Sequence, residues 1–297
     1  MLSLMLVGTV TLAGPSDRIV TNIELERQVR RTMPRYRSDW DVVVSDDGGS
    51  VFCKGLELNR FSATGPANNV GERIQFTRVG PIDMAITVSQ GGHISGNWAN
   101  GKHDQAQLVC ADDWSSVYVS YQTDRGDFLT SLDMGRRGKQ PNRSWQIPYL
   151  WLATRDAQNR DTLWGFRSVG QTQYLQSASI KSGKRLTSSK VPAEFDVLQY
   201  DPTTRRVLCT QGDGASQDVV LYHPPSSSKR VLPRRNEEGH YWMSRGDVYF
   251  QADAKLHREQ NNKWVPISDD TFIGKSANDK FWLIRREGQL YLRRFGD

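Results

Sequence analysis

The polar turns of this sequence recur at a nearly constant spacing. Turns rich in Gly, Asp, Asn and Ser separate apolar runs near residues 47, 91, 113, 158, 203, 246 and 278. Successive turns are 44, 22, 45, 45, 43 and 32 residues apart, so four of the six spacings lie between 43 and 45. A repeat of this length indicates one small unit used many times, because such a unit cannot bury both of its faces alone.

Between the turns the apolar residues alternate with polar ones, as they do in strands. From Trp40 onward, short runs rich in Val, Ile, Tyr, Phe, Trp and Thr are bounded by Gly, Asp, Asn, Ser and Pro, which predicts roughly two dozen short strands. Several strands in each repeat of ~44 residues are typical of a β-propeller blade. We therefore expect an all-β fold, a single β-propeller of six or seven blades with about four antiparallel strands each. A pair of β-sandwiches is the alternative, which so long a repeat disfavours.

The chain divides into three segments. Residues 1–16 contain an apolar, uncharged run that suits a signal peptide, although no Lys or Arg precedes it. Its Leu6–Leu12 stretch is rich in β-branched residues and fits a ring-closing strand equally well. Residues 17–38 form a helix and linker, since Thr21–Glu24 reads as a capping box and predicts a helix over 22–33. Residues 39–297 form the propeller domain.

Two turns resemble those of known propeller repeats. The segment Ser45–Phe52, SDDGGSVF, resembles the Asp box of sialidase-type blades, with Ser45, Asp47, Gly49 and Phe52 at the motif positions. The segment Tyr200–Thr204, YDPTT, resembles the interstrand turn of YVTN-type repeats. Asp boxes are structural turns remote from any catalytic centre, so the resemblance implies a fold and no particular reaction.

Composition and cysteine usage bear on the compartment. The chain has 297 residues, a net charge of +6 and a mean hydropathy of −0.61, and no apolar run reaches the roughly 18 residues of a transmembrane helix. Cys53, Cys110 and Cys209 each lie in an apolar run, which predicts buried free thiols. The signal-like start indicates a secreted or periplasmic protein, whereas the unpaired cysteines favour the alternative, a cytoplasmic one.

No sequence motif identifies a reaction. The chain lacks a nucleophile elbow, a phosphate-binding loop and a dinucleotide-binding motif, and its five histidines have no metal-ligand spacing, so we expect no metal and no cofactor. Carboxylates occur in predicted turns: Asp46, Asp47, Asp112, Asp113, Asp133, Asp156, Asp201, Asp269 and Asp270. A propeller glycosidase gathers two or three acids at its central mouth, but turn formation alone explains these residues. The sequence leaves catalysis uncertain and favours a protein that is not an enzyme.

Aromatic and basic residues point to recognition. Four tryptophans near strand ends are candidate ligand-binding residues that stack on a sugar or contact a partner: Trp98, Trp114, Trp145 and Trp264. Basic clusters lie around residues 27–37, 136–143 and 229–235, too far apart to predict specific binding of nucleic acid. We expect a monomeric, non-catalytic interaction module that binds a protein or glycan through loops on one propeller face. The alternative is a sialidase-like glycoside hydrolase with acids at the central mouth.

Overall fold

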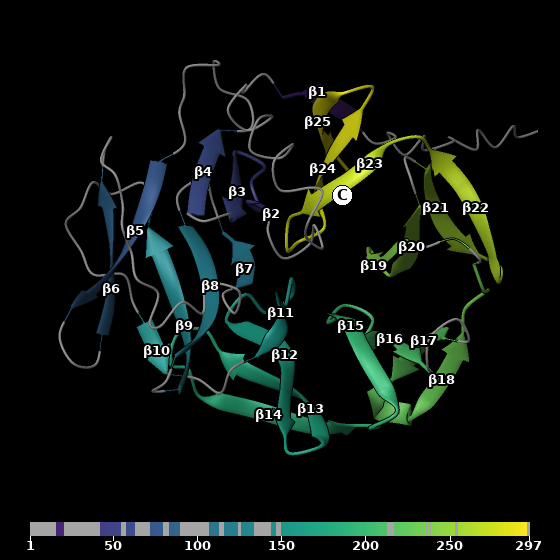
Figure 1. Ribbon diagram of the computed structural model, residues 1–297, viewed down its shortest axis with the longest axis horizontal. Coiled ribbons are helices and arrows are strands. Elements are labelled where there is room, and N and C mark those ends of the chain that lie inside the picture. The colour runs from purple at the N-terminus through teal and green to yellow at the C-terminus, as the bar shows by residue number, and fades with distance from the viewer. Residues whose placement is uncertain are drawn as a thin grey trace, which may run out of the picture.

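The protein is an all-β propeller, and Figure 1 shows its sheets arranged in a ring in chain order. The computed structural model describes residues 16–20, 42–54, 58–62, 72–79, 83–89, 107–112, 116–123, 126–133, 144–146, 150–212, 217–235, 237, 239–252 and 255–295. Helical structure in these residues is confined to the short 3-10 turn η4, Pro224–Ser226. The helix predicted over 22–33 lies outside the described residues.

Four sheets have the predicted blade form of four antiparallel strands in chain order. The first contains β7 (Gln107–Ala111), β8 (Ser116–Thr123), β9 (Gly126–Asp133) and β10 (Ser144–Gln146). The second contains β11 (Trp151–Arg155), β12 (Thr162–Val169), β13 (Thr172–Ser179) and β14 (Arg185–Val191). The third contains β15 (Phe195–Asp201), β16 (Arg206–Gln211), β17 (Asp218–His223) and β18 (Ser228–Val231). The fourth contains β19 (His240–Ser244), β20 (Asp247–Ala252), β21 (Lys255–Gln260) and β22 (Lys263–Ser268).

The remaining strands form one nine-stranded sheet that joins the two ends of the chain. In spatial order it contains β1 (Ser16–Ile19), β25 (Gln289–Arg294), β24 (Phe281–Arg286), β23 (Thr271–Lys275), β2 (Val42–Val44), β3 (Ser50–Lys54), β4 (Leu58–Ser62), β5 (Glu72–Val79) and β6 (Asp83–Ser89). Its two halves meet where β2 pairs in parallel with β23, with Val43 opposite Lys275. Gly274 allows this approach, because a Cβ there would lie 2.6 Å from the Val42 carbonyl oxygen.

The strand that opens each sheet lies at the centre of the ring. Contacts run from β23 to β2, from β2 to β7, from β7 to β11, from β11 to β15 and from β15 to β19. Six of the seven predicted turns follow one of these innermost strands, namely those near residues 47, 113, 158, 203, 246 and 278. The turn near residue 91 lies outside the described residues, after β6. The spacing differs there because the described residues contain four strands, β3 to β6, between the innermost strands β2 and β7.

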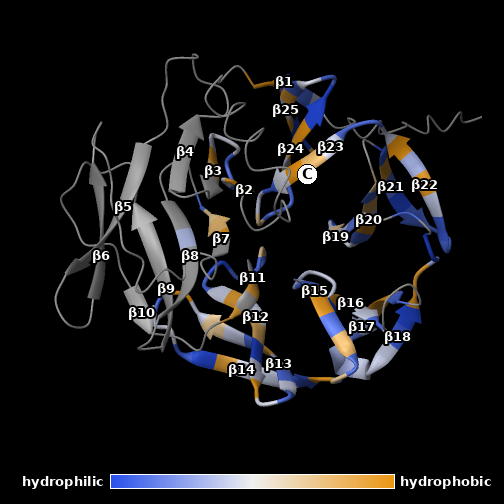
Figure 2. Cartoon of the chain, viewed as in Figure 1, coloured by the Kyte–Doolittle hydropathy of each residue, from blue (hydrophilic) through white to orange (hydrophobic). Residues whose placement is uncertain are grey.

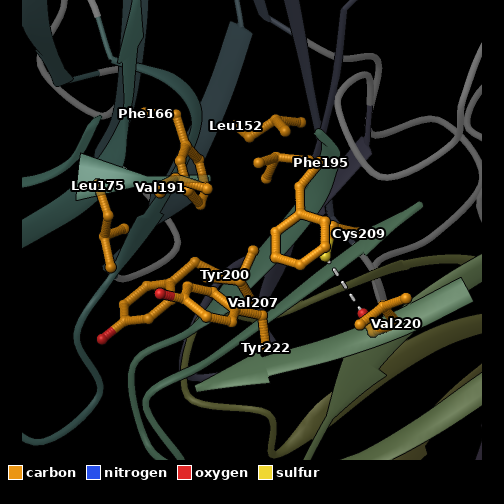
Figure 3. Close-up of a cluster of buried hydrophobic side chains, with 11 residues drawn as sticks. Leu152, Phe166, Leu175, Val191, Phe195, Tyr200, Val207, Cys209, Val220 and Tyr222 are labelled. Carbon is orange, nitrogen blue, oxygen red and sulfur yellow. Dashed lines mark hydrogen bonds between the residues drawn. The ribbon is translucent and has the colours of Figure 1, made fainter. Parts of the chain in front are cut away.

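The hydrophobic core lies between neighbouring sheets. A cluster of eleven buried residues joins the sheet of β11–β14 to that of β15–β18, with Phe166 and Leu175 on one side and Tyr200 and Val207 on the other (Figure 3). Further clusters join the sheets on either side, and the outer strand β18 carries hydrophilic colour (Figure 2). Each sheet therefore depends on its neighbours for burial, as the repeat spacing predicts.

Two of the three cysteines occupy this core as free thiols. Cys110 and Cys209 are buried, and burial raises the pKa of each thiol to about 12. These thiols therefore pack as small apolar side chains, as predicted. In the described part of the chain, no helix has the length and apolar character to cross a membrane.

An N-terminal strand completes the sheet that contains the C-terminus. Strand β1 pairs antiparallel with β25, with Ser16 opposite Arg294 and Ile19 opposite Tyr291. The predicted ring-closing segment, Leu6–Leu12, lies outside the described residues, and β1 begins a few residues after it. Pairing covers the edge that β25 presents, and open strand edges are prone to aggregation.

Charged side chains hold β1 in place. The Asp17 carboxylate accepts hydrogen bonds from Arg286 (2.8 Å) and from Arg293 Nε (2.8 Å) and Nη2 (2.9 Å). The buried Asp270 carboxylate binds the same two guanidiniums, at 2.6 Å from Arg286 Nε and 2.8 Å from Arg293 Nη2. The Arg293 hydrogen bond lowers the pKa of Asp17 despite its partial burial. Burial acts to raise the pKa of Asp270, but the two arginines outweigh it and the net shift is downward.

We predict that Asp17→Asn lowers the free energy of unfolding by about 2 kcal/mol at neutral pH, because two charge-assisted hydrogen-bond partners lose their anion. The folded-state pKa of Asp17 lies below its ordinary value of 3.8. The difference between wild type and variant is therefore constant well above pH 3.8 and disappears as the pH falls through the folded-state pKa. Urea unfolding across this pH range measures the difference.

The matched control is Asp218→Asn, which removes a partly exposed carboxylate 2.6 Å from the exposed guanidinium of Arg234. We expect a change within about 0.5 kcal/mol, because exposed ion pairs contribute little. Equal losses in the two variants would show that the Asp17 contacts do not hold the strand.

Candidate functional site at the inner turns

The turn between β2 and β3 is closed by hydrogen bonds of its own side chains. The Ser45 hydroxyl donates to Asp47 Oδ1 (2.5 Å) and accepts from the Ser50 amide (2.9 Å), and the Gly49 amide donates to Asp47 Oδ1 (2.8 Å). Phe52 follows in β3 and is fully buried. The predicted structural positions Ser45, Asp47, Gly49 and Phe52 therefore all lie in or directly after one turn that binds its own backbone.

A second copy of this turn joins β23 to β24. The Ser276 hydroxyl donates to Asn278 Oδ1 (2.6 Å), the Lys280 amide donates to the same oxygen (3.0 Å), and the Phe281 amide donates to Ser276 Oγ (3.1 Å). Asp279 takes the left-handed position (φ 57°) that Gly48 (φ 71°) takes in the first turn. Both turns read Ser-x-Asp/Asn in the sequence, at residues 45–47 and 276–278.

Gly48 gives a direct test of the first turn. Its φ is 71°, and a Cβ at this position would lie 2.6 Å from the Phe281 ring at the start of β24. We predict that Gly48→Ala costs about 2–4 kcal/mol, the sum of left-handed strain and overpacking. Thermal or urea unfolding measures it.

Gly170→Ala is the control, since Gly170 has φ 59° with no atom within 4 Å of the added methyl. This substitution adds only backbone strain, which we expect to cost about 1 kcal/mol. The prediction fails if the two alanine variants are equally stable.

Asp46, the neighbour of Asp47, takes part in an ion cluster that joins the turns after β2, β7 and β11. Its carboxylate pairs with Arg155 at the end of β11 and with Arg160 (2.9 Å), and Arg155 also pairs with Asp112 after β7. The Arg155 and Asp46 side chains are 1% and 2% exposed, whereas those of Asp112 and Arg160 are 31% and 63% exposed. Arg155 is thus a buried cation between two carboxylates from different inner turns.

Hydrogen bonds extend this cluster from turn to turn. Asn278 donates from its amide to Asp46 Oδ1 (3.1 Å) and from its side chain to the Asp46 carbonyl (2.9 Å). The neighbouring Asp279 accepts from the Ser244 hydroxyl (2.8 Å) and from the Arg245 amide (3.1 Å) after β19. We call this set the inner-turn cluster: Asp46, Asp112, Arg155, Arg160, Ser244, Asn278 and Asp279. It connects the turns after β19, β23, β2, β7 and β11.

The other described carboxylates at inner turns cap backbone amides. Asp156 accepts from the amides of Gln158 (2.9 Å) and Asn159 (3.0 Å), and Asp201 accepts from the Thr203 amide (3.0 Å). Among the described residues, no group of three or more His, Cys, Asp or Glu side chains is placed to hold a metal ion. The acids that reach this end of the ring therefore act as counterions and caps.

We predict that Arg155→Met lowers the free energy of unfolding by about 3–5 kcal/mol, because it leaves Asp46 buried without its main countercharge. The control is Arg160→Met, which removes the exposed partner of the same carboxylate and should cost less than about 1 kcal/mol. Urea unfolding compares the two, and an Arg155→Met variant as stable as the control would contradict a structural role for the buried pair.

The structure places one of the four candidate tryptophans in full. Trp264 in β22 is partly buried, donates from its indole N–H to the Pro233 carbonyl (2.8 Å), and lies 5.7 Å from the rings of Tyr241 and Phe250. Trp145 lies in β10, although its side chain is outside the described set. Trp98 and Trp114 lie outside the described residues, so a shared binding surface for the four stays a prediction.

Of the three basic clusters expected from the sequence, the one at residues 229–235 lies within the described residues. Most of its positive charges are paired with carboxylates. Arg230 forms a two-point pair with Glu259 (3.0 Å for both contacts), Arg234 pairs with Asp218, and Arg235 pairs with Glu237 (2.6 Å each). The clusters at residues 27–37 and 136–143 lie outside the described residues. Local charge along the sequence thus overstates the positive surface available at residues 229–235.

Comparison with known proteins yields similarity of structure alone. No family model matches the chain, and no curated protein sequence matches it. Among solved structures it is similar to a protein assigned as TolB from Agrobacterium tumefaciens, with 12% identity, a TM-score of 0.49 and coverage of 96% of this chain and 99% of that one. It is also similar to the hydrazine synthase of Kuenenia stuttgartiensis, with 13% identity, a TM-score of 0.43 and coverage of 86% and 95%.

A further similarity is to a chain in a nidogen–laminin complex, with 10% identity, a TM-score of 0.40 and coverage of 76% and 78%. Identities this low concern the fold and transfer no activity or partner. The assignment as a propeller rests on the sheet order and on the inner-strand contacts described above.

Proposed function

We propose that this protein is a non-catalytic recognition module that binds a protein or a glycan through exposed loops and strands of the propeller. The observation that supports this most directly is that the described carboxylates at the inner turns are already bound to other groups of the protein. Asp46 and Asp112 neutralise Arg155, and Asp156 and Asp201 cap their own turns. A glycosidase needs one carboxyl free to donate a proton and another free to act as base or nucleophile, and carboxylates held by a buried guanidinium serve neither role well.

The test compares hydrolysis with binding. The purified chain is assayed with fluorogenic glycosides, sialosides included, between about pH 4 and 8, and separately probed on glycan and peptide arrays. We expect no turnover above that of heat-denatured protein and saturable binding that free ligand displaces. Hydrolysis that disappears in Asp112→Asn, measured in a variant shown to be folded, would overturn the proposal in favour of a glycoside hydrolase.

We further infer that the ring has six blades. The nine-stranded sheet contains two innermost strands, β2 and β23, which pair with each other in parallel through one residue pair. Counting its halves as separate blades adds two to the four separate sheets. An experimental structure with another innermost strand between β6 and β7 would give seven instead.

Location, oligomeric state and contact residues follow from the same proposal. We propose a monomer in a secreted or periplasmic location, since β1 begins at Ser16, directly after the apolar run and the small residues Ala13 and Gly14. Trp98, Trp114, Trp145 and Trp264 remain the candidate ligand contacts. Mass spectrometry of the N-terminus of exported protein and size-exclusion chromatography test the first two statements.

A further inference from the structure

The sheet of β11–β14 carries an excess of positive charge, with Asp161 as the acidic residue nearest to it, 3.1 Å from the Lys181 amide. Between Thr162 and Ala193 the chain has five basic residues and no acidic residue. The five are Arg167, Lys181, Lys184, Arg185 and Lys190. Within the described part of the chain none of them forms an ion pair, whereas Arg230, Arg234 and Arg258 on the next two sheets each pair with a carboxylate.

The strand register places three of these charges on one face of the sheet. Arg167 in β12 lies opposite Tyr174 in β13, and Tyr174 lies opposite Lys190 in β14. Arg185 lies opposite Ala178, four residues along the same face of β13, because alternate residues of a strand share a face. Lys181 and Lys184 occupy the hairpin that leads into β14. Four of the five charges thus lie on the outer strand β14 or in the hairpin before it, and Arg167 lies in β12.

Within the described residues, strand β14 pairs with another strand on one side only, and it also contacts η4. It ends the order β11-β12-β13-β14, and its residues from Arg185 to Lys190 are all exposed, with Leu186 51% exposed. With seven residues it is longer than the outer strands β10 and β18, with three and four, and it lacks the proline that interrupts β22 at Pro266. Such an edge presents backbone N–H and C=O groups that can pair with an added strand.

We propose that β14 is a docking strand for an acidic, extended peptide segment of a partner protein, which adds to the β11–β14 sheet as a fifth strand. This inference rests on the proposed recognition function and names its partner class. Backbone hydrogen bonds would supply affinity, and the basic side chains would select acidic sequences. The same charges repel a second copy of this edge, which disfavours self-association through β14.

Three labelled octapeptides serve as probes in fluorescence anisotropy with the full chain. One alternates Glu and Val, one alternates Lys and Val, and one is the Glu–Val peptide with a methyl group on every backbone amide nitrogen. The N-methylated peptide has the charge and side chains of the first but no backbone N–H donors, so it cannot form the hydrogen bonds of an added strand. We expect the Glu–Val peptide to bind at least about tenfold more tightly than either of the others, and more weakly as salt is raised.

Two double variants locate the site. Arg185→Glu with Lys190→Glu reverses the charge of the edge and should weaken binding of the Glu–Val peptide at least about tenfold. Lys255→Glu with Lys263→Glu makes the same change in net charge at exposed residues of β21 and β22 and should weaken it less than about twofold. All four positions are exposed, and circular dichroism melting checks that both variants fold.

Equal binding of the Glu–Val peptide and its N-methylated form would overturn strand addition. An equal loss in the two double variants would overturn the assignment to β14. A sulfated dextran oligosaccharide that binds at the same edge while the Glu–Val peptide does not would overturn the peptide class in favour of an anionic glycan. Each of these results leaves the general recognition function standing, because that function fails separately, through the glycoside hydrolysis assay.

Discussion

Closure of the ring is the constraint on which the rest of the structure depends. The sheets β11–β14, β15–β18 and β19–β22 each bury apolar side chains against two neighbours, so an open ring would expose such faces together with a strand edge. Closure occurs at two places in one sheet. Strand β1 pairs with β25, and ion pairs of Asp17 and Asp270 with Arg293 stabilise this pairing. Strand β2 pairs with β23, where Gly274 has no side chain to separate the two backbones.

The charges at the inner end of the ring serve this closure. Asp46 contacts Arg155 on one side and Asn278 on the other, so a single carboxylate joins turns that follow three different innermost strands. A buried cation such as Arg155 is tolerated because two carboxylates surround it. The described charged residues at this end of the ring are thus bound to one another. Under the proposed recognition function, the partner contacts exposed outer strands such as β14, whose residues 185–190 are all exposed.

Much of the fold was predictable from local sequence, and the candidate site was predictable only in part. The turns near residues 47, 158, 203, 246 and 278 follow innermost strands, as the spacing predicts, because Asp, Asn, Gly and Ser satisfy turn backbones locally. The self-capping roles of Asp47, Asp156 and Asp201 were predictable for the same reason. The roles of Arg155 and Asn278 were not, since their partner Asp46 lies more than a hundred residues away in the chain.

By itself, the sequence determined the strand period, the blade-length repeat and the turns, all of which depend on contacts within a few residues. Only the tertiary structure decided which charges are neutralised. The adjacent residues Asp46 and Asp47 show the difference. Asp46 pairs with Arg155 of another sheet, whereas Asp47 accepts a hydrogen bond from the backbone of its own turn. Arg230 and Arg234 meet carboxylates of Glu259 and Asp218 from other strands, whereas none of the basic residues between 181 and 190 forms an ion pair within the described residues. Ion pairing depends on what folding brings opposite each side chain, and local composition does not record it.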